Sequence, residues 1–456
     1  MEIRFVWIVF LCCLVLPIMP SLGGAAIPAP LKRLTKDGRS SLDGAGMVAP
    51  KTGRIAFYRA VSENTRQLVV MDSKGRKPIL VEEAGWPDNA VWSPEGNRLA
   101  YTWKAAGAAE AALKLWQYGQ AEPRALFQGA PTYRLLLWSP DGRWIAAEKH
   151  RPDRAQVTLS VFDAAGGKET ELCPTHFNAG GAHDTFGWSP DSRQLCFPSQ
   201  ATEGDSRGLW VCNVDGTELR RLTPPECKLK AHTRWSPDGK WIFFQAGYQR
   251  ADSNDKYTDV WLIHPDDSEM HAITQGSSED WSRRYSYGVF RWVSDNRQVL
   301  VRELSPDPAR KDLAPLWGYV DVQTGEVIHA LGPNISSNHR ESDYPYWALS
   351  ADGKRFFCYW TESAYEGLGT AEEKKGKSWY VGGLFDLPSH TYRELFRFER
   401  EASGPSLAGV PALSPQADRV YLTVKQPGPG GSSETDIYTI DVSNCAGPCI
   451  LDLSGG

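Results

Sequence analysis

Ten side chains able to bind a ligand occupy one kind of position in the sequence, just before or at the start of a predicted first β-strand. They are His183, Asp184, His232, Arg283, Arg284, Tyr287, His339, Arg340, Asp343 and Tyr344. Asp88, Asn89 and Arg134 hold the corresponding places earlier in the chain. Arginine and histidine form charge-assisted hydrogen bonds with carboxylates, and tyrosine adds an apolar ring with a polar tip. The mixture predicts binding of a peptide or a carboxylated sugar. The alternative for each residue is an ordinary solvated loop side chain.

The elements that must position these residues are copies of one hairpin. Eight copies align, and they begin at Met47, Val91, Leu137, Gly187, Arg234, Arg291, Ala348 and Ala412. The second to fifth are sharp, as in "RWSPDGKWIFF" from Arg234, and the outer ones are degraded. The proline position of the turn recurs every 44 to 64 residues, and periods of this size are typical of propeller blades.

Each position of the Ser-Pro-Asp-Gly turn has a physical role. Proline presets φ at the first corner, aspartate accepts local backbone hydrogen bonds, and glycine adopts the left-handed conformation that lets the chain return. The strand that follows is nearly all apolar, as expected of a strand buried on both faces. Five tryptophans close the first strands, and each is predicted to wedge between neighbouring units. They are Trp92, Trp138, Trp188, Trp235 and Trp292.

A second signature follows each hairpin, as in "LWVCNVDGTELRRLT" from Leu209, and reads strand, turn, strand. Each unit therefore supplies four antiparallel strands, which predicts an all-β propeller of eight four-stranded blades over 47–456. Seven blades, with Met47–Arg59 as an extra strand pair, are the alternative. Within the N-terminal segment 27–46, "LKRLT" at 31–35 matches "RRLT" at 220–223, so we expect it to add an outer strand to the last blade. The C-terminal "CILDL" competes for that place.

The pairing of "WSPDG" with "DGTELRRLT" resembles the WD-like repeat of the TolB-like β-propeller family. The resemblance covers about residues 31–453 and implies the propeller fold, but it does not specify a function. The α/β domain that precedes the propeller in TolB proteins has no counterpart in this sequence, which separates the chain from that protein within the family.

The N-terminus "MEIRFVWIVFLCCLVLPIMPSLGGAA" has the layout of a secretory signal peptide: Arg4, an apolar run, helix breakers and small residues up to Ala26. We expect residues 1–26 to be removed and the protein to be periplasmic or secreted, without a membrane span. A retained anchor is the alternative, although the apolar run is shorter than the roughly 20 residues of a spanning helix.

Export favours disulfide formation. The predicted pairs are Cys196 with Cys212, on neighbouring strands, and Cys445 with Cys449, in "CAGPC". Cys358, within the apolar run "RFFCYW", is predicted to be buried as a thiol. No C-x-x-C motif or Cys/His cluster occurs, so the sequence predicts neither a metal site nor another cofactor.

The charge pattern bears on partners. The chain has 50 Lys+Arg against 55 Asp+Glu and a formal charge of −5, without long runs of one sign. This excludes a basic footprint for nucleic acid or an anionic membrane. We expect a monomer.

Loop lengths predict which face binds. The turns between first and second and between third and fourth strands are short, whereas the other connections vary and lie on the opposite face. The long connections belong to repeats five to eight, at 247–259, 275–288, 304–315, 361–378 and 426–436. Recognition loops concentrate on such faces, so we expect the binding face on that half of the ring.

Two enzyme classes carry related propellers. Serine peptidases of this kind need a hydrolase domain with G-x-S-x-G, which the sequence lacks. Oligogalacturonate lyases resemble this chain in their degenerate repeats, but where they have a His-Pro-His step this chain has Tyr344-Pro345-Tyr346. Convergence of His183, His232 and His339 would keep that alternative open. The sequence favours a non-catalytic binding or scaffold protein that recognises a protein or peptidoglycan-associated partner in the envelope.

Overall fold

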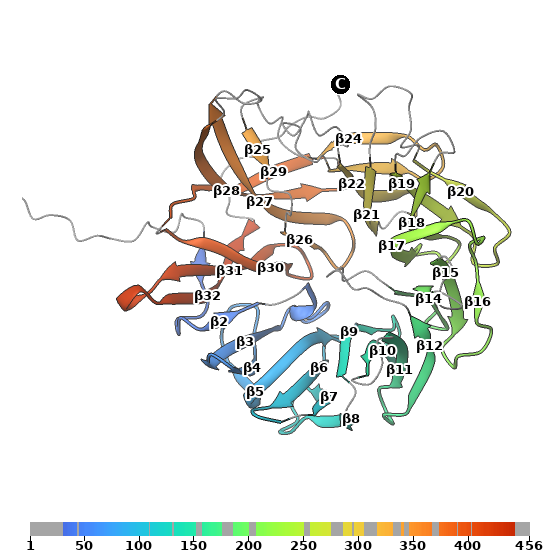
Figure 1. Cartoon of the computed structure of the whole chain (residues 1–456). Coiled ribbons are helices and arrows are strands. Elements are labelled where there is room, and N and C mark those ends of the chain that lie inside the picture. The colour runs from blue at the N-terminus through green and yellow to red at the C-terminus, as the bar shows by residue number, and fades with distance from the viewer. Residues whose placement is uncertain are drawn as a thin grey trace, which may run out of the picture.

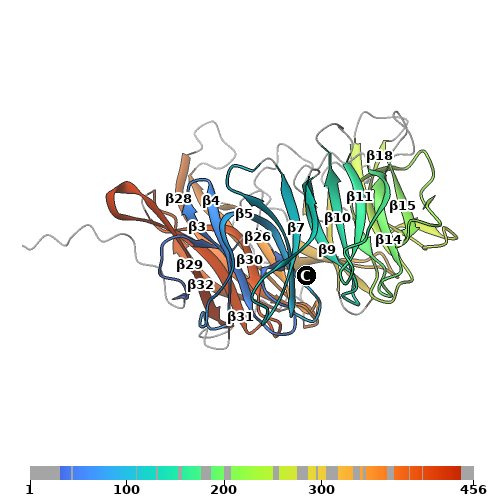
Figure 2. The ribbon, with the colours of Figure 1, turned by 90° about the horizontal axis from the view of Figure 1, so that it is seen from below.

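The chain folds as an all-β propeller, a ring of blades around a central axis (Figure 1). The computed structural model describes residues 31–442 apart from 43–44, 109, 130–131, 152–156, 176–185, 200–206, 250–255, 275–285, 294–295, 305–316, 332–338, 342–345, 367–373, 390 and 403. Within that part, the elements are strands and two short 3-10 turns, η1 (Ala45–Met47) and η4 (Pro429–Gly431). Seen from the side, the sheets stand next to one another, with their strands running across the thickness of the ring (Figure 2).

The described strands form seven sheets. The first contains β2 (Ser40–Ser41), β3 (Ile55–Ser62), β4 (Thr65–Met71), β5 (Ile79–Trp92), β6 (Arg98–Ala105), β7 (Ala111–Gln117) and β8 (Arg124–Gly129). The next contains β9 (Thr132–Trp138), β10 (Trp144–His150), β11 (Val157–Asp163) and β12 (Glu169–Thr175). Two four-stranded sheets follow, with β13 (Gly187–Trp188), β14 (Gln194–Ser199), β15 (Gly208–Asn213) and β16 (Arg220–Arg221), then β17 (Lys228–Trp235), β18 (Ile242–Gln249), β19 (Lys256–Ile263) and β20 (Met270–Ala272).

Three sheets complete the ring. One contains β21 (Ser286–Trp292), β22 (Gln298–Leu304), β23 (Trp317–Asp321) and β24 (Val327–Leu331). The next contains β25 (His339–Glu341), β26 (Tyr346–Leu349), β27 (Arg355–Glu366), β28 (Lys374–Asp386) and β29 (Thr391–Glu399). The last contains β30 (Ser406–Leu413), β31 (Arg419–Pro427), β32 (Ser433–Asp441) and the N-terminal β1 (Lys32–Arg33).

The predicted turn chemistry recurs at one end of the sheets. In four repeats the turn serine donates its hydroxyl to the aspartate two residues later at 2.6 Å and accepts the backbone N–H five residues later at 2.9 Å. The serines are Ser139, Ser189, Ser236 and Ser350. Gly239 takes φ of 74°, and Ser192, which replaces glycine in the fourth repeat, takes φ of 64°. Each of these serines is buried, so the turn satisfies its own polar groups.

The tryptophans join consecutive repeats by hydrogen bonds. Four indole N–H groups donate to the backbone carbonyl that lies just before the equivalent position in the preceding repeat. The pairs are Trp92 to Met47 (3.1 Å), Trp138 to Val91 (3.1 Å), Trp188 to Leu137 (3.2 Å) and Trp292 to Arg234 (3.4 Å). The indole nitrogen of Trp235 has no partner among the described residues. Each of these tryptophans except Trp235 therefore packs between two repeats and makes one hydrogen bond to the preceding repeat.

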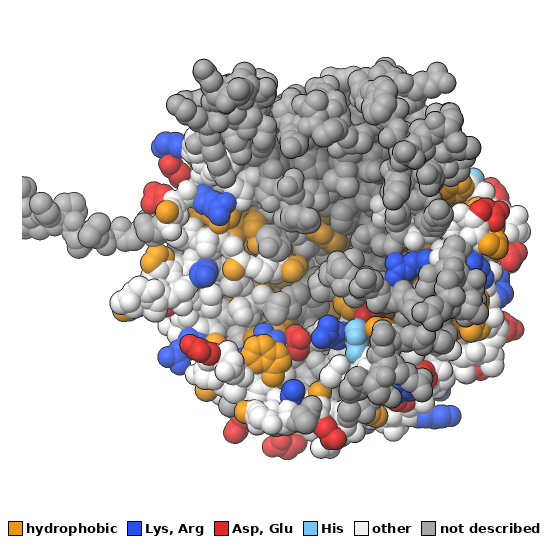
Figure 3. Space-filling view, viewed as in Figure 1, with side chains coloured by type: hydrophobic (Ala, Val, Ile, Leu, Met, Phe, Trp, Pro, Cys, Tyr) orange, Lys and Arg blue, Asp and Glu red, His pale blue; other side chains and the backbone are white. Residues whose placement is uncertain are grey.

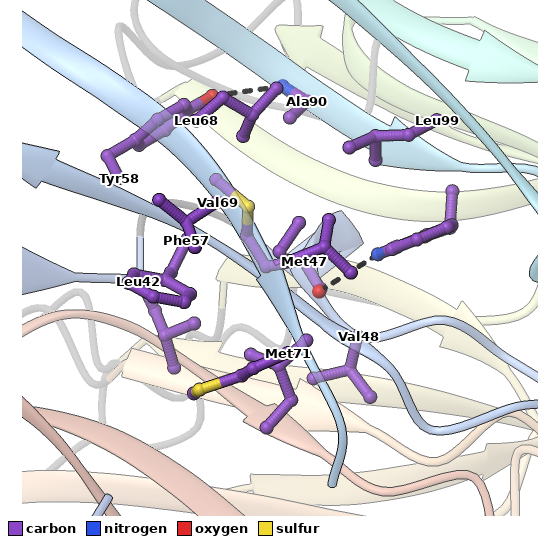
Figure 4. Close-up of a cluster of buried hydrophobic side chains, with 14 of the residues drawn as sticks. Leu42, Met47, Val48, Phe57, Tyr58, Leu68, Val69, Met71, Ala90 and Leu99 are labelled. Atoms are coloured by element: carbon purple, nitrogen blue, oxygen red, sulfur yellow. Dashed lines mark hydrogen bonds between the residues drawn. The ribbon is translucent and has the colours of Figure 1, made fainter. Parts of the chain in front are cut away.

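Apolar clusters fill the spaces between neighbouring sheets. The largest unites Tyr58 of β3, Trp92 of β5 and Tyr421 of β31, so it connects the two ends of the chain. Figure 4 shows part of this cluster, with the Tyr58 hydroxyl accepting the Ala90 N–H at 3.2 Å. Burial of apolar area is the main stabilising contribution of such contacts.

The ring closes through the N-terminal strand. In β1, Lys32 pairs with Thr439 and Arg33 with Tyr438 of β32, so residues 31–35 lie where their match with 220–223 predicted an outer strand. Thr35 Oγ1 donates to Asp436 at 2.6 Å and accepts the Ile437 N–H at 2.9 Å. The same arrangement occurs within another sheet, where Thr274 donates to Asp259 and accepts the Val260 N–H. The competing segment "CILDL" lies outside the described residues.

Three of the five predicted long loops are largely strand where the structure describes them. In 247–259, β18 continues to Gln249 and β19 begins at Lys256, and in 426–436, β31 continues to Pro427 and β32 begins at Ser433. Most of 361–378 is strand, because β27 continues to Glu366 and β28 begins at Lys374. Glu366 lies directly opposite Lys374, and Tyr365 opposite Lys375. Such cross-strand pairs stabilise a hairpin, so a polar, charged segment extends the sheet where polarity alone suggested a loop.

Candidate functional site

The first strands of the blades are irregular near their beginnings, on the face that carries the variable connections. In β5 the pairing shifts between Asp88 and Val91, and β21 and β30 shift at similar points. Asn89 and Leu135, each three residues before a wedge tryptophan, have φ of 52° and 51°. Bulges of this kind redirect side chains at the rims of β structures. They set the orientation of the polar residues that precede them.

Arg66 of β4 is the centre of one polar group at this rim. Its guanidinium lies 3.9 Å from the ring centroid of Tyr58 and 4.7 Å from that of Trp86. Nε donates to the Pro87 carbonyl at 2.8 Å, and Nη2 donates to Asp88 Oδ1 at 3.2 Å. Trp86 is 44% exposed, whereas the Arg66 side chain is 16% exposed. The cation is therefore in contact with both rings, of which Trp86 is partly exposed to solvent.

A buried polar group supports this part of the sheet from within. Glu82, on β5, accepts the Tyr101 hydroxyl at 2.7 Å and Lys114 Nζ at 2.6 Å. Lys114 Nζ also lies 4.0 Å from the ring centroid of Trp103. A side chain at Gly85 would meet Trp103 Nε1 at 2.7 Å, so only glycine fits there. These contacts connect β5 to β6 and β7. Both charged side chains, Glu82 and Lys114, are paired with each other.

A second polar group lies in the sheet β9–β12. Lys149 Nζ donates to Glu169 Oε1 at 2.7 Å and to Glu171 Oε2 at 3.2 Å, and Arg151 also binds Glu171. The Lys149 side chain is 9% exposed. Burial, and then the negative charge of Glu169, raise the pKa of Tyr133 above its ordinary value. The positive and negative charges in this group are matched, which is the arrangement of a structural ion-pair network.

Most of the predicted ligand-binding residues lie outside the described part of the chain. His183, Asp184, Arg283, Arg284, Asp343 and Tyr344 are among these. His232 lies in β17, Tyr287 in β21, and His339 and Arg340 in β25, where the backbone is placed and the side chains are not described. Tyr287 pairs with Glu303, and His339 with Ala364. Of the predicted set, these four lie in described strands, and Tyr287, His339 and Arg340 lie at strand starts.

The structure brings together a different group of side chains around Arg66, and the sequence analysis had named only two of its members. Asp88 and Asn89 were expected at the start of a first strand, and they lie within the part of β5 that pairs with β6. The sequence analysis did not name Arg66 or Trp86. Arg66 lies in β4, the third strand of the first repeat, whereas the analysis considered only residues near first strands. Trp86 lies in a segment without a turn or repeat signal. An exposed tryptophan next to Pro87 in an otherwise polar stretch was the available signal.

The predicted disulfide between Cys196 and Cys212 is wrong. Cys196 lies opposite Val211, and Cys212 lies opposite Leu195. A shift of one register position sends the two side chains to opposite faces of the sheet, where they join different apolar clusters. Cys196 is a free thiol, and burial raises its pKa to about 12. Cys358 is buried, as expected, and Cys445 and Cys449 lie outside the described residues.

Within the described residues, no three His, Cys, Asp or Glu side chains gather as a metal site. In the same part of the chain, no helix has the length and apolar character to cross a membrane. The segment predicted as a signal peptide, 1–26, is not among the described residues.

Comparison with known proteins adds structural neighbours. No protein-family model matches the chain, and no curated protein matches it by sequence. An oligogalacturonate lyase from Vibrio parahaemolyticus is 12% identical with a TM-score of 0.48, over 90% of this chain and 93% of that one. TolB from Acinetobacter baumannii is 12% identical with a TM-score of 0.37, over 76% and 79%. The β-propeller domain of the Trilobed protease from Pyrococcus furiosus is 12% identical with a TM-score of 0.47, over 80% and 99%. No activity or ligand follows for this chain from these similarities.

Proposed function

We propose that the chain is an exported, non-catalytic binding propeller of the TolB-like type, with eight blades, that recognises a protein or peptidoglycan-associated partner in the cell envelope. The partner binds the face of the variable connections, on the half formed by repeats five to eight. This half includes Arg283 and Arg284.

The blade number rests on β5. This strand has 14 residues, and its first part pairs with β4 while its second part pairs with β6. It serves as the outer strand of the first repeat and the inner strand of the second. This division of β5 supports two blades within the seven-stranded sheet, and with the six other sheets it supports the proposed count of eight.

The observation that best supports binding comes from the same face in the first three repeats, where some polar groups are fixed and others are exposed. Lys149 is held in paired contacts between Glu169 and Glu171. The exposed members, such as Trp86 and Asp88, are presented on a rigid sheet. Rigid presentation of aromatic and charged side chains is typical of recognition surfaces.

Co-purification from envelope extracts tests the proposal. The double variant Arg283→Ala/Arg284→Ala should lose proteins that the unaltered chain retains. The control is Arg193→Ala/Lys240→Ala, two exposed basic residues on the short-turn face, which should retain them. Equal retention by all three proteins would contradict the proposal. Bound Mn²⁺ together with unsaturated product from polygalacturonate fragments would replace it with the lyase alternative.

A further inference from the structure

The edge of β32 that receives the N-terminal strand is a slot with its own sequence selectivity. We call this edge, from Thr435 to Thr439, the β32 slot. We propose that the β32 slot is a peptide-binding site, in which an extended segment with the residue order Leu-Lys-Arg-Leu-Thr of 31–35 can take the place of β1. The site is separate from the face proposed for the envelope partner. In Figure 1, β32 lies next to β2, where the two ends of the chain meet.

Backbone contacts give the slot a general affinity for an extended segment. Lys32 and Arg33 of β1 pair with β32, and the Leu34 N–H donates to the Ile437 carbonyl at 2.8 Å. Addition of a strand to a sheet edge is a common mode of peptide recognition, in which main-chain bonds supply affinity and side chains supply specificity. Because β1 is only two residues long, its side chains must provide much of the selectivity.

Four side chains of the resident segment fit the slot. The Asp436 carboxylate is 2% exposed, binds the Arg33 guanidinium and accepts the Thr35 hydroxyl at 2.6 Å. Leu34 packs against the apolar cluster shared with the first sheet, and Leu31 packs against the cluster shared with the sheet of β27. A segment without arginine would leave a buried carboxylate without its counter-ion, which is costly.

Two other sheets show which contact is special to the slot. In both, the threonine that follows the outer strand accepts a backbone N–H of the neighbouring strand, as Thr35 does. In one of these sheets, Gly208 takes the place of Asp436. In the other, Ala272 takes the place of Arg33. Of these three sheets, only the one whose outer strand comes from the other end of the chain has the complete Arg–Asp pair.

Sequence and charge together define the segment that fits. The C-terminal "CILDL" at 449–453, predicted as a competitor, contains neither arginine nor threonine. It therefore cannot make the contacts of β1 with Asp436. Figure 3 shows basic and acidic side chains interspersed on the described part of one face of the molecule, so general attraction of a basic peptide does not replace this selection.

The resident strand competes with any free peptide. A segment joined to its site by a short connection acts at an effective concentration on the order of millimolar. A free peptide should therefore bind weakly to the unaltered chain and more tightly once β1 is weakened. Thr35→Val removes the hydroxyl that donates to Asp436 and accepts the Ile437 N–H, and it leaves β32 unaltered.

Fluorescence anisotropy on the full mature chain tests the proposal. The probe is a labelled peptide of residues 31–38, "LKRLTKDG". Thr35→Val should bind it at least ten-fold more tightly than the unaltered chain does. A peptide with alanine in place of the arginine, and a scrambled peptide of the original composition, should each bind Thr35→Val at least ten-fold more weakly than the original.

The matched control is Thr274→Val, which removes the same kind of contact from an outer strand that a short turn connects to its neighbour. This variant should bind the peptide no better than the unaltered chain. The proposal is overturned if Thr35→Val gains no affinity, if Thr274→Val gains as much, or if the alanine or scrambled peptide binds as well as the original.

A second readout locates the binding. The original peptide should raise the unfolding temperature of Thr35→Val, and the alanine peptide should not. If Thr35→Val does not fold, Leu34→Ala weakens β1 through its apolar contact and is subject to the same expectations. Equal effects of the two peptides on the unfolding temperature would contradict recognition of the arginine by Asp436.

Discussion

The ring is joined in two ways, and the two kinds of joint differ in what they remove from water. Between consecutive repeats, an indole N–H meets a backbone carbonyl within an apolar cluster. At the closure, the carboxylate of Asp436 is 2% exposed and binds the Arg33 guanidinium and the Thr35 hydroxyl. A neutral contact can be weakened gradually, whereas a buried charge is stable only while its partners are present. Removing one partner of Asp436 at the closure should therefore cost more stability than removing one hydrogen bond between consecutive repeats.

The largest effect is expected at the closure. Arg33→Ala leaves Asp436 buried without its counter-ion, so we expect the free energy of unfolding to fall by about 3 kcal/mol. Chemical denaturation measures this change. The control Arg76→Ala removes an exposed pair with Asp72, in which Arg76 is 66% exposed, and should cost less than about 1 kcal/mol. Equal costs for the two variants would contradict the distinction between the joints.

A smaller effect is expected at the consecutive joints, where the chain provides its own control. Trp138→Phe removes the donor to the Val91 carbonyl, and Trp235→Phe removes an indole nitrogen without a partner among the described residues. Trp138→Phe should therefore cost about 1 kcal/mol more than Trp235→Phe in thermal or chemical unfolding. A larger loss of stability for Trp235→Phe than for Trp138→Phe would show that the size of the ring, and not the hydrogen bond, determines how much each tryptophan stabilises the fold.

The smallest effects are expected at the turns and depend on pH. Burial acts to raise the pKa of Asp191, Asp238 and Asp352, but the serine hydroxyl and a backbone N–H at each turn outweigh it and hold the pKa below its ordinary value. A lowered folded-state pKa means that the contribution is complete above the unfolded value of about 3.9 and is lost as the pH falls through the folded value. Denaturation curves between pH 5 and pH 2.5 measure this loss. Replacing the three aspartates with asparagine should flatten the dependence, and an unchanged slope would contradict the assignment.

The sequence predicted the repeating parts well and the singular parts poorly. The serine, aspartate and glycine of the turns act within a few residues, so local chemistry was sufficient to predict their bonds. The Arg66–Trp86 contact joins β4 and β5 through a bulged register, which no residue pattern specifies. The proposed Cys196–Cys212 pair failed for a related reason, since a one-residue register difference decides the face of each side chain.

The N-terminal strand also determines when the molecule can become complete. Arg33 and Asp436 are separated by 403 positions in sequence. Until β32 has been synthesised, β1 lacks the only strand with which it pairs among the described residues, and the growing polypeptide has an uncovered strand edge. Contacts of such separation slow folding and prolong exposure to aggregation. A chaperone that keeps the nascent polypeptide open until its last strand emerges would therefore raise the yield of closed rings.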